Sequence, residues 1–274
     1  MYILADIGGT KTRIAGSTDL ASFGEPVIFD TPGSYSEGLA LLRTTIQEVA
    51  GSAAIEAVGM GLPVLLTHDK RGIEYATNLP DWAGHVIAND LEREPGTRVV
   101  LENDVAMVGL GESVYGAGRG ARVVVYITVS TGVNGVRIIN GTLNASNLGV
   151  STGRQYVTMG EKPVTWEDLI SGKAVKKKYG KLPREIEKES PVWEELARTT
   201  AFGVHNTILH WTPDRVVLGG SMFNDIGISV DRVRFYCEEI RSGIPHTPEI
   251  GHSALGAVGG LWGAMARLKQ EVAH

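Results

Sequence analysis

The sequence predicts an α/β fold of two related lobes around a central cleft. Short apolar runs alternate with segments of helical periodicity along the chain, as in folds built from strand and helix layers. Two apolar runs, 2–7 and 123–129, are each followed by a glycine-containing loop and a returning segment. No long linker separates the halves, so we expect 1–110 plus 258–274 to form a small N-terminal lobe and 111–257 a large C-terminal lobe.

The individual elements follow from apolar spacing and from the residues that end each run. In the helix expected over 36–50, apolar residues recur every three or four positions, and Pro63 ends a strand over 58–62. The other strands are expected over 2–7, 13–16, 99–101, 123–129, 136–139 and 215–218, and the other helices over 105–115, 166–179, 193–211 and 254–268.

The composition excludes several classes of protein. The single cysteine, Cys237, rules out an internal disulfide and a cysteine-rich zinc site. The net charge of −5 provides no basic field for nucleic acid or an acidic membrane. No apolar run approaches the ~20 residues of a membrane span, and the first residues lack the pattern of a signal peptide. A soluble, cytoplasmic protein without nucleic-acid or membrane partners is therefore expected.

The glycine loops are candidates for phosphate binding. Glycine makes up 35 of 274 residues, and backbone N–H groups without a neighbouring Cβ can approach a phosphate closely. Asp6 stands before the first loop, where it could hold Mg²⁺ directly or through water. The second loop, 130–135, has the same character. The alternative is that both loops are simple hairpin turns and that Asp6 is incidental.

Two acidic segments have both a chemical and a structural interpretation. Asp104 follows a buried strand, where ligands of α/β sheets bind, and could take a proton from a substrate hydroxyl; it could equally cap the next helix. Glu167 could bind sugar hydroxyls, or residues 165–168 could form a capping box. The lysines of 176–178 are expected on a solvated helix face, and the histidines show no metal-binding spacing.

In combination, these segments resemble the ROK family of sugar kinases and related repressors. The matches run in order along nearly the whole chain, and the ordered set is far more specific than any one motif. They are D-I-G-G-T-K at 6–11, G-L-P at 61–63, N-L-P-D-W at 78–82, E-N-D at 102–104, G-E at 111–112, G-A-G-R-G at 116–120, S-T-G-V at 130–133, W-E-D-L-I-S-G at 166–172 and V-L-G-G-S at 217–221.

This resemblance implies an actin-like ATPase (ribonuclease H-like) fold and ATP-dependent, Mg²⁺-dependent phosphorylation of a sugar, as in glucokinase. Asp104 would be the catalytic base, and Asp6 would hold Mg²⁺. A homodimer would be compatible with the family. The implied substrate-binding residues are Asn78, Asn103, Ser151, Arg154 and Glu167, and the implied nucleotide-binding residues are Asp6, Gly8, Gly9, Thr10, Lys11, Thr131, Gly132, Gly219 and Gly220.

The chain departs from the family pattern in several places. The phosphate motif begins at residue 6, so the helix-turn-helix of the repressors is not expected. The cysteine-rich zinc motif is missing, and no zinc is expected. Where the family has E-x-G-H, alignment on Gly153 gives Ser151 and Arg154 instead of the sugar-contacting Glu and His. Asn134 replaces a family glycine in the second loop.

The altered E-x-G-H segment leaves two functions open. Losing two charged hydrogen bonds of ~1.5–3 kcal/mol each would weaken binding of ordinary glucose about a hundredfold to ten-thousandfold. Arg154 could instead recognise a carboxylate or phosphate on an unusual substrate, or lie in a drifted surface loop. The first hypothesis is therefore a sugar kinase of altered specificity. The second is a catalytically weak or inactive sugar or nucleotide sensor. A DNA-binding repressor is the least supported.

Overall fold

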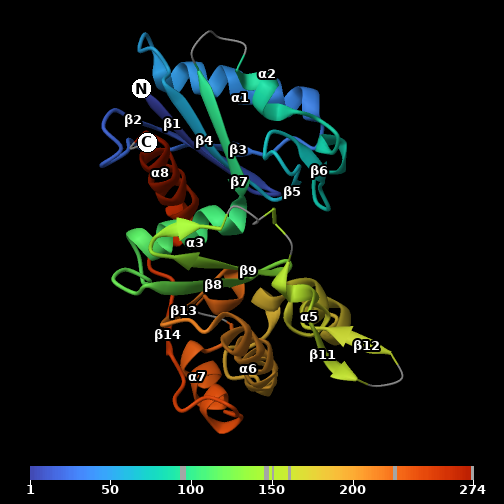
Figure 1. Cartoon of the computed structure of the whole chain (residues 1–274). Helices are drawn as coiled ribbons and strands as arrows, with labels where there is room; N and C mark the ends of the chain where they lie inside the picture. The colour runs from blue at the N-terminus through green and yellow to red at the C-terminus, as the bar shows by residue number, and fades with distance from the viewer. Residues whose placement is uncertain (93–96, 145–147, 150, 160–161, 225–226, 273–274) are drawn as a thin grey trace. The chain divides into compact units, whose positions relative to one another are not determined.

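Each strand–loop–strand repeat of the sequence begins a five-stranded sheet in the part of the chain that the structure describes. The structure, a computed structural model, describes residues 1–92, 97–144, 148–149, 151–159, 162–224 and 227–272. The chain divides into two units (Figure 1). Unit 1 comprises Met1–Tyr115, Leu143–Val150 and Leu255–His274, and unit 2 comprises Gly116–Thr142 and Ser151–Ala254.

The sheet of unit 1 has the order β3-β2-β1-β4-β7. β1 pairs with β2 in antiparallel fashion and with β4 in parallel fashion, and β4 pairs in parallel with β7. The carboxyl ends of β1, β4 and β7 therefore lie along one edge of the sheet. The strands are β1 (Tyr2–Ile7), β2 (Lys11–Ser17), β3 (Val27–Asp30), β4 (Ala57–Leu62) and β7 (Arg98–Asn103).

Helices cover both faces of this sheet (Figure 1). Ile3 and Ile7 of β1 belong to the core shared with α1 (Tyr35–Ala50) and α2 (Ile87–Leu91), whereas Leu4 belongs to the core shared with α3 (Asp104–Val114) and α8 (Gly259–Val272). Successive side chains of a strand point to opposite faces, so a strand covered on both sides must be apolar at nearly every position. This requirement explains why residues 2–7 are apolar except for Asp6.

The N-L-P-D-W segment anchors α1. It follows a small hairpin, β5 (Leu65–Leu66) and β6 (Ile73–Tyr75), and forms the short helix η1 (Pro80–Trp82). A Cβ on Gly38 would lie 2.3 Å from the ring of Trp82, so this helical glycine makes room for the indole. Asp81 accepts a hydrogen bond from the backbone N–H of Tyr35 (2.8 Å) and thereby caps α1.

The sheet of unit 2 has the order β10-β9-β8-β13-β14, in which a hairpin is followed by parallel strands as in unit 1. This shared pattern confirms the repeat predicted from the two loops. The strands of the sheet are β8 (Val123–Val129), β9 (Val133–Ile139), β10 (Thr142–Leu143), β13 (Arg215–Gly219) and β14 (Glu249–His252), and β11 (Tyr156–Met159) pairs with β12 (Pro163–Thr165). The helices of unit 2 are η2 (Thr152–Arg154), α4 (Glu167–Ile170), α5 (Gly172–Tyr179), η3 (Pro183–Glu185), α6 (Pro191–Trp211), η4 (Ser221–Phe223) and α7 (Val230–Glu239). The short helix η5 (Gly256–Val258) belongs to unit 1.

Two predicted helices differ from the structure. The helix expected over 166–179 is interrupted at Ser171, whose backbone is extended and whose hydroxyl oxygen accepts a hydrogen bond from the N–H of Ala174 (3.1 Å). The break lets the N–H of Gly172 donate to the carbonyl of Ser130 (2.7 Å). The helix expected from residue 254 begins instead at Gly259, after the single turn η5. Among the described residues, no helix has the length and apolar character needed to span a membrane.

Candidate active site

The first glycine loop is a tight turn between β1 and β2. The N–H of Gly8 donates to the carbonyl of Lys11 (2.9 Å). Thr31 holds the turn from outside: its hydroxyl donates to the carbonyl of Gly8 (2.8 Å), and its N–H donates to the carbonyl of Thr10 (2.9 Å). Gly9 and Thr10, at the apex, are exposed. The predicted phosphate loop is therefore a fixed turn with an exposed apex.

Two other predicted residues lie against this turn. A Cβ on Gly9 would be 3.3 Å from the Cβ of Asn78, so the predicted sugar contact packs against the predicted phosphate loop. Lys11 forms an ion pair with Asp30 (2.6 Å), and both side chains are largely exposed. An exposed pair of this kind is weak, and it leaves the ammonium group of Lys11 free to exchange partners.

Asp6 and Asp104 come together at the carboxyl edge of the sheet. Asp6 is in register with Gly61 of β4, and a Cβ on Gly61 would lie only 3.4 Å from the Cα of Asp104. Both carboxylates are half-buried. Burial raises the pKa of Asp6 to about 6, against the opposing effect of Arg13. Burial, together with the charge of Asp6, raises the pKa of Asp104 to about 7.

Asn103, and not Asp104, is the N-cap of α3. Its Oδ1 accepts hydrogen bonds from the N–H groups of Val105 (3.1 Å) and Ala106 (3.4 Å), and its amide nitrogen donates to the carbonyl of Val64 (3.1 Å). The capping alternative considered for Asp104 is thus wrong by one residue. Asn103 is buried and engaged in these bonds, and its role as a sugar contact stays a prediction.

The second glycine loop forms the corresponding turn of unit 2. The N–H of Ser130 donates to the carbonyl of Gly132 (2.8 Å), and Thr131 at the apex is exposed. On one side, Gly172 donates to the carbonyl of Ser130. On the other side, the N–H of Val133 donates to Oε2 of Glu167 (2.8 Å). The W-E-D-L-I-S-G segment therefore forms hydrogen bonds with both ends of the turn.

The departures from the E-x-G-H motif also lie near the second turn. The hydroxyl of Ser151 donates to the carbonyl of Val133 (2.5 Å). Arg154 lies near Glu167, with 3.5 Å between Nη2 and Oε1, and its side chain is 62% exposed. Asn134 accepts hydrogen bonds from its neighbour Gly135 (2.8 Å) and from the N–H of Thr152 (3.3 Å). The structure thus brings Ser151, Arg154 and Glu167 together around the second turn.

Trp166 fixes the position of Glu167. Its indole is fully buried against α6, where a Cβ on Gly203 would lie 2.2 Å from the ring. The hydroxyl oxygen of Thr165 accepts a hydrogen bond from the N–H of Asp168 (3.3 Å), and the same hydroxyl donates to the Asp168 carboxylate (2.6 Å). The bonds between Thr165 and Asp168 stabilise the start of α4, and Glu167 still reaches the second turn. The two interpretations of residues 165–168 are therefore compatible.

Gly219 and Gly220 end β13 in a crowded environment. A Cβ on Gly219 would be 2.6 Å from the hydroxyl of Tyr126, and one on Gly220 would be 2.4 Å from the carbonyl of Val129. Gly220 also has φ +94°, which favours glycine. Packing alone thus requires both glycines. Their predicted contact with a nucleoside stays a prediction.

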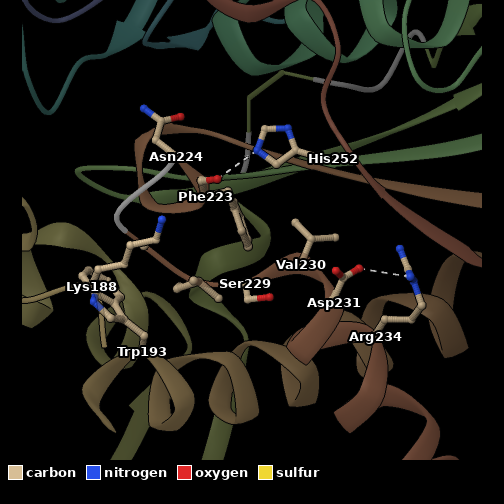
Figure 2. A pocket seen from close by; sticks show the side chains of 11 residues that line it. Lys188, Trp193, Phe223, Asn224, Ser229, Val230, Asp231, Arg234 and His252 are labelled. Atoms are coloured by element: carbon tan, nitrogen blue, oxygen red, sulfur yellow. Dashed lines mark hydrogen bonds and ion pairs between the residues drawn. The ribbon is translucent and has the colours of Figure 1, made fainter. Parts of the chain in front are cut away.

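A separate feature of unit 2 is a pocket of about 440 Å³, whose lining includes the end of η4 and the start of α7 (Figure 2). Phe223 and Asn224 line one wall, and the start of α7 lines another. Nε2 of His252 is hydrogen-bonded to the carbonyl of Phe223 (2.9 Å), and this contact ties η4 to β14. Lys188 extends along the rim in Figure 2.

Two features of unit 1 were missed by the sequence reasoning. A Cβ on Gly260, near the start of α8, would lie 2.3 Å from the Cγ of Asp6, so α8 approaches that carboxylate closely. The buried Glu102 carboxylate receives the ammonium group of Lys70 (2.8 Å) and the guanidinium of Arg267 (3.3 Å). The run G-G-L-W-G at 259–263 could have indicated close helix packing, but no local pattern links Glu102 to Lys70.

No cluster of three or more His, Cys, Asp or Glu side chains suited to a metal occurs among the described residues. Mg²⁺ in kinases is commonly held by one or two carboxylates together with phosphates and water. The carboxylates of Asp6 and Asp104 fit that donor set, because burial and the charge of Asp6 raise the pKa of Asp104 and a cation held by these residues would offset both effects.

The comparison with protein families is decisive. A family model described as "ROK family" matches residues 2–271. The chain belongs to the ROK family. Among the relatives of this chain, a glucokinase of Thermotoga maritima is 28% identical to it, and the match covers 56% of this chain and 49% of that protein. A glucokinase of Streptomyces coelicolor is 23% identical, with 85% of this chain and 86% of that protein covered.

The ROK assignment also accounts for the fold. A solved ROK family glucokinase from Streptomyces griseus, in complex with glucose and AMPPNP, superimposes with a TM-score of 0.80 at 24% identity, covering 98% of this chain and 99% of that one. The likeness confirms the predicted actin-like ATPase fold. The chain spans about half the length of the Thermotoga relative that it matches.

Proposed function

We propose that the protein is an ATP-dependent carbohydrate kinase, which transfers a phosphoryl group to a hydroxyl of a sugar or sugar derivative. The observation that carries the proposal is the half-buried carboxylate of Asp104, with its pKa near 7, at the same sheet edge as Asp6 and the first turn. Family membership and the sugar-kinase names of its relatives support the same chemistry. Unit 1 would act as the lobe that carries the base, and unit 2 as the lobe that carries the second phosphate turn.

In this mechanism, Asp104 accepts the proton of the acceptor hydroxyl as its oxygen attacks the transferring phosphoryl group. A base with a pKa near the working pH combines a large ionised fraction with a strong proton affinity, so the raised pKa suits the task. The backbone N–H groups of the two turns, in Gly9–Thr10 and Thr131–Gly132, would stabilise the charge on the phosphoryl oxygens.

Asp6 would hold Mg²⁺, directly or through water. When bound, the ion supplies positive charge that offsets the charge of the transferring group. The close approach of Gly260 limits where the Asp6 carboxylate can move, so the chain itself keeps this ligand at the sheet edge.

The nucleoside would lie beside Gly219 and Gly220, and the pocket lined by Phe223 and Asn224, a few residues further along the chain, would give room for a nucleobase. Its volume of about 440 Å³ lies within the range of small-molecule sites. The asparagine Asn224 and the lysine Lys188 supply polar groups at its edge.

The test is ADP release from the purified protein with ATP, Mg²⁺ and a panel of neutral, amino and acidic sugars. At least one sugar should be phosphorylated, and Asp104→Asn should lower that turnover by about a hundredfold to ten-thousandfold. Asp19→Asn, which changes an exposed carboxylate in the segment after β2, is the matched control. Undiminished turnover in Asp104→Asn would reject the assigned base. Nucleotide binding without turnover on any sugar would favour the sensor hypothesis.

A further inference from the structure

Val133, the first residue after the second turn, is held at both of its backbone groups by side chains distant in the sequence. Its N–H donates to Oε2 of Glu167 (2.8 Å), and its carbonyl accepts from the hydroxyl of Ser151 (2.5 Å). Val133 is buried, so neither bond is exposed to strong competition from water.

The two side chains that hold Val133 are fully engaged there. The single hydroxyl hydrogen of Ser151 is used by the Val133 carbonyl, while its oxygen accepts from the N–H of Gly153 (3.2 Å) and so begins η2. The second carboxylate oxygen of Glu167 faces Arg154. A substrate that replaced Val133 at the hydroxyl hydrogen of Ser151 or at Oε2 of Glu167 would have to break one of these two bonds.

The groups around Val133 are closely packed. A Cβ on Gly153 would be 2.3 Å from the carbonyl oxygen of Val133, and one on Gly132 would be 2.8 Å from Oε2 of Glu167. Because the carbonyl of Ser130 is also fixed, by Gly172, the exposed Thr131 and the half-buried Gly132 are anchored on both sides. A short turn that is anchored at both ends presents its N–H groups in one arrangement.

We propose that Ser151 and Glu167 are positioning residues for the nucleotide phosphates: by clamping Val133 they hold the N–H groups of Thr131 and Gly132 in the geometry that binds the donor. This inference rests on the proposed function for the identity of the ligand. It departs from the family resemblance, which makes both positions sugar contacts. The replacement of Glu by Ser at 151 then creates the second half of the clamp, because a serine hydroxyl donates to a carbonyl oxygen and a carboxylate does not.

The experiment measures ADP affinity of the full chain by calorimetry with Mg²⁺ and without sugar. Ser151→Ala removes one clamp bond and should weaken ADP binding about fivefold. Glu167→Leu should do the same, whereas Glu167→Gln, whose amide oxygen can still accept from Val133, should stay within twofold. Ser190→Ala is the matched control, because its hydroxyl oxygen caps α6 of the same unit by accepting from Val192. It should leave ADP affinity within twofold.

A second measurement separates positioning from sugar contact. With the best sugar substrate, Ser151→Ala should raise the KM for ATP about fivefold and change the KM for the sugar less than twofold. A sugar KM that rises as much as the ATP KM, or an ADP affinity that stays within twofold in both Ser151→Ala and Glu167→Leu, overturns the clamp. If one variant fails to fold, as judged by circular dichroism, the other decides.

The two proposals fail in different ways. An unaltered chain that does not bind ADP contradicts the nucleotide part of the proposed function, and the clamp falls with it. An unaltered chain that binds ADP normally, with variants that bind it equally well, contradicts the clamp alone.

Discussion

Asp104 and Asp6 are both neighbours of Gly61: Asp6 is its register partner in β1, and a Cβ on Gly61 would lie 3.4 Å from the Cα of Asp104. Burial raises the pKa of both groups, and the charge of Asp6 raises that of Asp104 further, to about 7. Ionising both carboxyl groups in the folded protein therefore costs free energy. A bound cation, or a proton taken from the substrate, would lower that cost.

The first prediction is that Asp104→Asn stabilises the metal-free protein at alkaline pH. A carboxyl with a raised pKa binds more protons when folded than when unfolded, so stability falls as the pH rises from about 4 through about 7. Removing the charge should raise the free energy of unfolding by about 2 kcal/mol or more at pH 8, and by less at pH 5. Urea unfolding in EDTA at both pH values measures this. A gain that is larger at pH 5 than at pH 8 would contradict the assignment of the raised pKa.

The second prediction concerns the buried ion pair of Glu102 and Lys70. Lys70→Met leaves the Glu102 carboxylate, which is 1% exposed, with only the longer contact from Arg267. Breaking one partner of a buried pair should destabilise the fold by about 3–5 kcal/mol. The control is Lys178→Met, which removes an exposed ion pair to Glu195 and should cost about 1 kcal/mol or less. Equal urea midpoints for the two variants would show that the Glu102 pair is no stronger than a surface pair.

The third prediction tests the contact between α8 and Asp6. The methyl group of Gly260→Ala would lie 2.3 Å from the Cγ of Asp6, so the carboxylate or the helix must move. We expect kcat to fall by about tenfold or more, as a displacement of the order of 1 Å costs catalysis heavily, and half-maximal activity to require more Mg²⁺. Gly251→Ala, where an added Cβ meets nothing within 4 Å, is the control. Unchanged Mg²⁺ dependence in Gly260→Ala would argue against Asp6 as the metal ligand.

The fourth prediction separates the two roles of Asn103. Asn103→Ala removes the cap of α3 and should lower the free energy of unfolding by about 1–2 kcal/mol. Asn103→Ser keeps a side-chain oxygen that can accept from Val105 or Ala106 and adds no charge beside Asp104, so it should be the more stable of the two variants. Thermal unfolding at pH 7 compares them. Equal losses in Asn103→Ser and Asn103→Ala would mean that donation to the Val64 carbonyl, which both variants lose, matters more than the cap.

The elements that sequence reasoning predicted best are those with strong local signals. The run over 123–129 matches β8 at both ends, because β-branched residues fill it and Ser130 begins a turn. The helix over 166–179 was predicted as one piece because its periodicity continues through Ser171. The hydrogen bond from Gly172 to the carbonyl of Ser130, a partner 42 positions away in the chain, interrupts it, and no local pattern carries that information.

The site shows the same division. The sequence by itself determined the α/β class, the repeated strand–turn–strand units and the residue types that the turns and Asp104 supply, because spacing and residue type are local properties. Only the tertiary structure decided that Asn103 rather than Asp104 caps α3, that Gly260 lies against Asp6, and that Ser151 and Glu167 both hold Val133. Those relationships join segments that are far apart in the chain or turn on side-chain direction, and packing alone decides which groups meet.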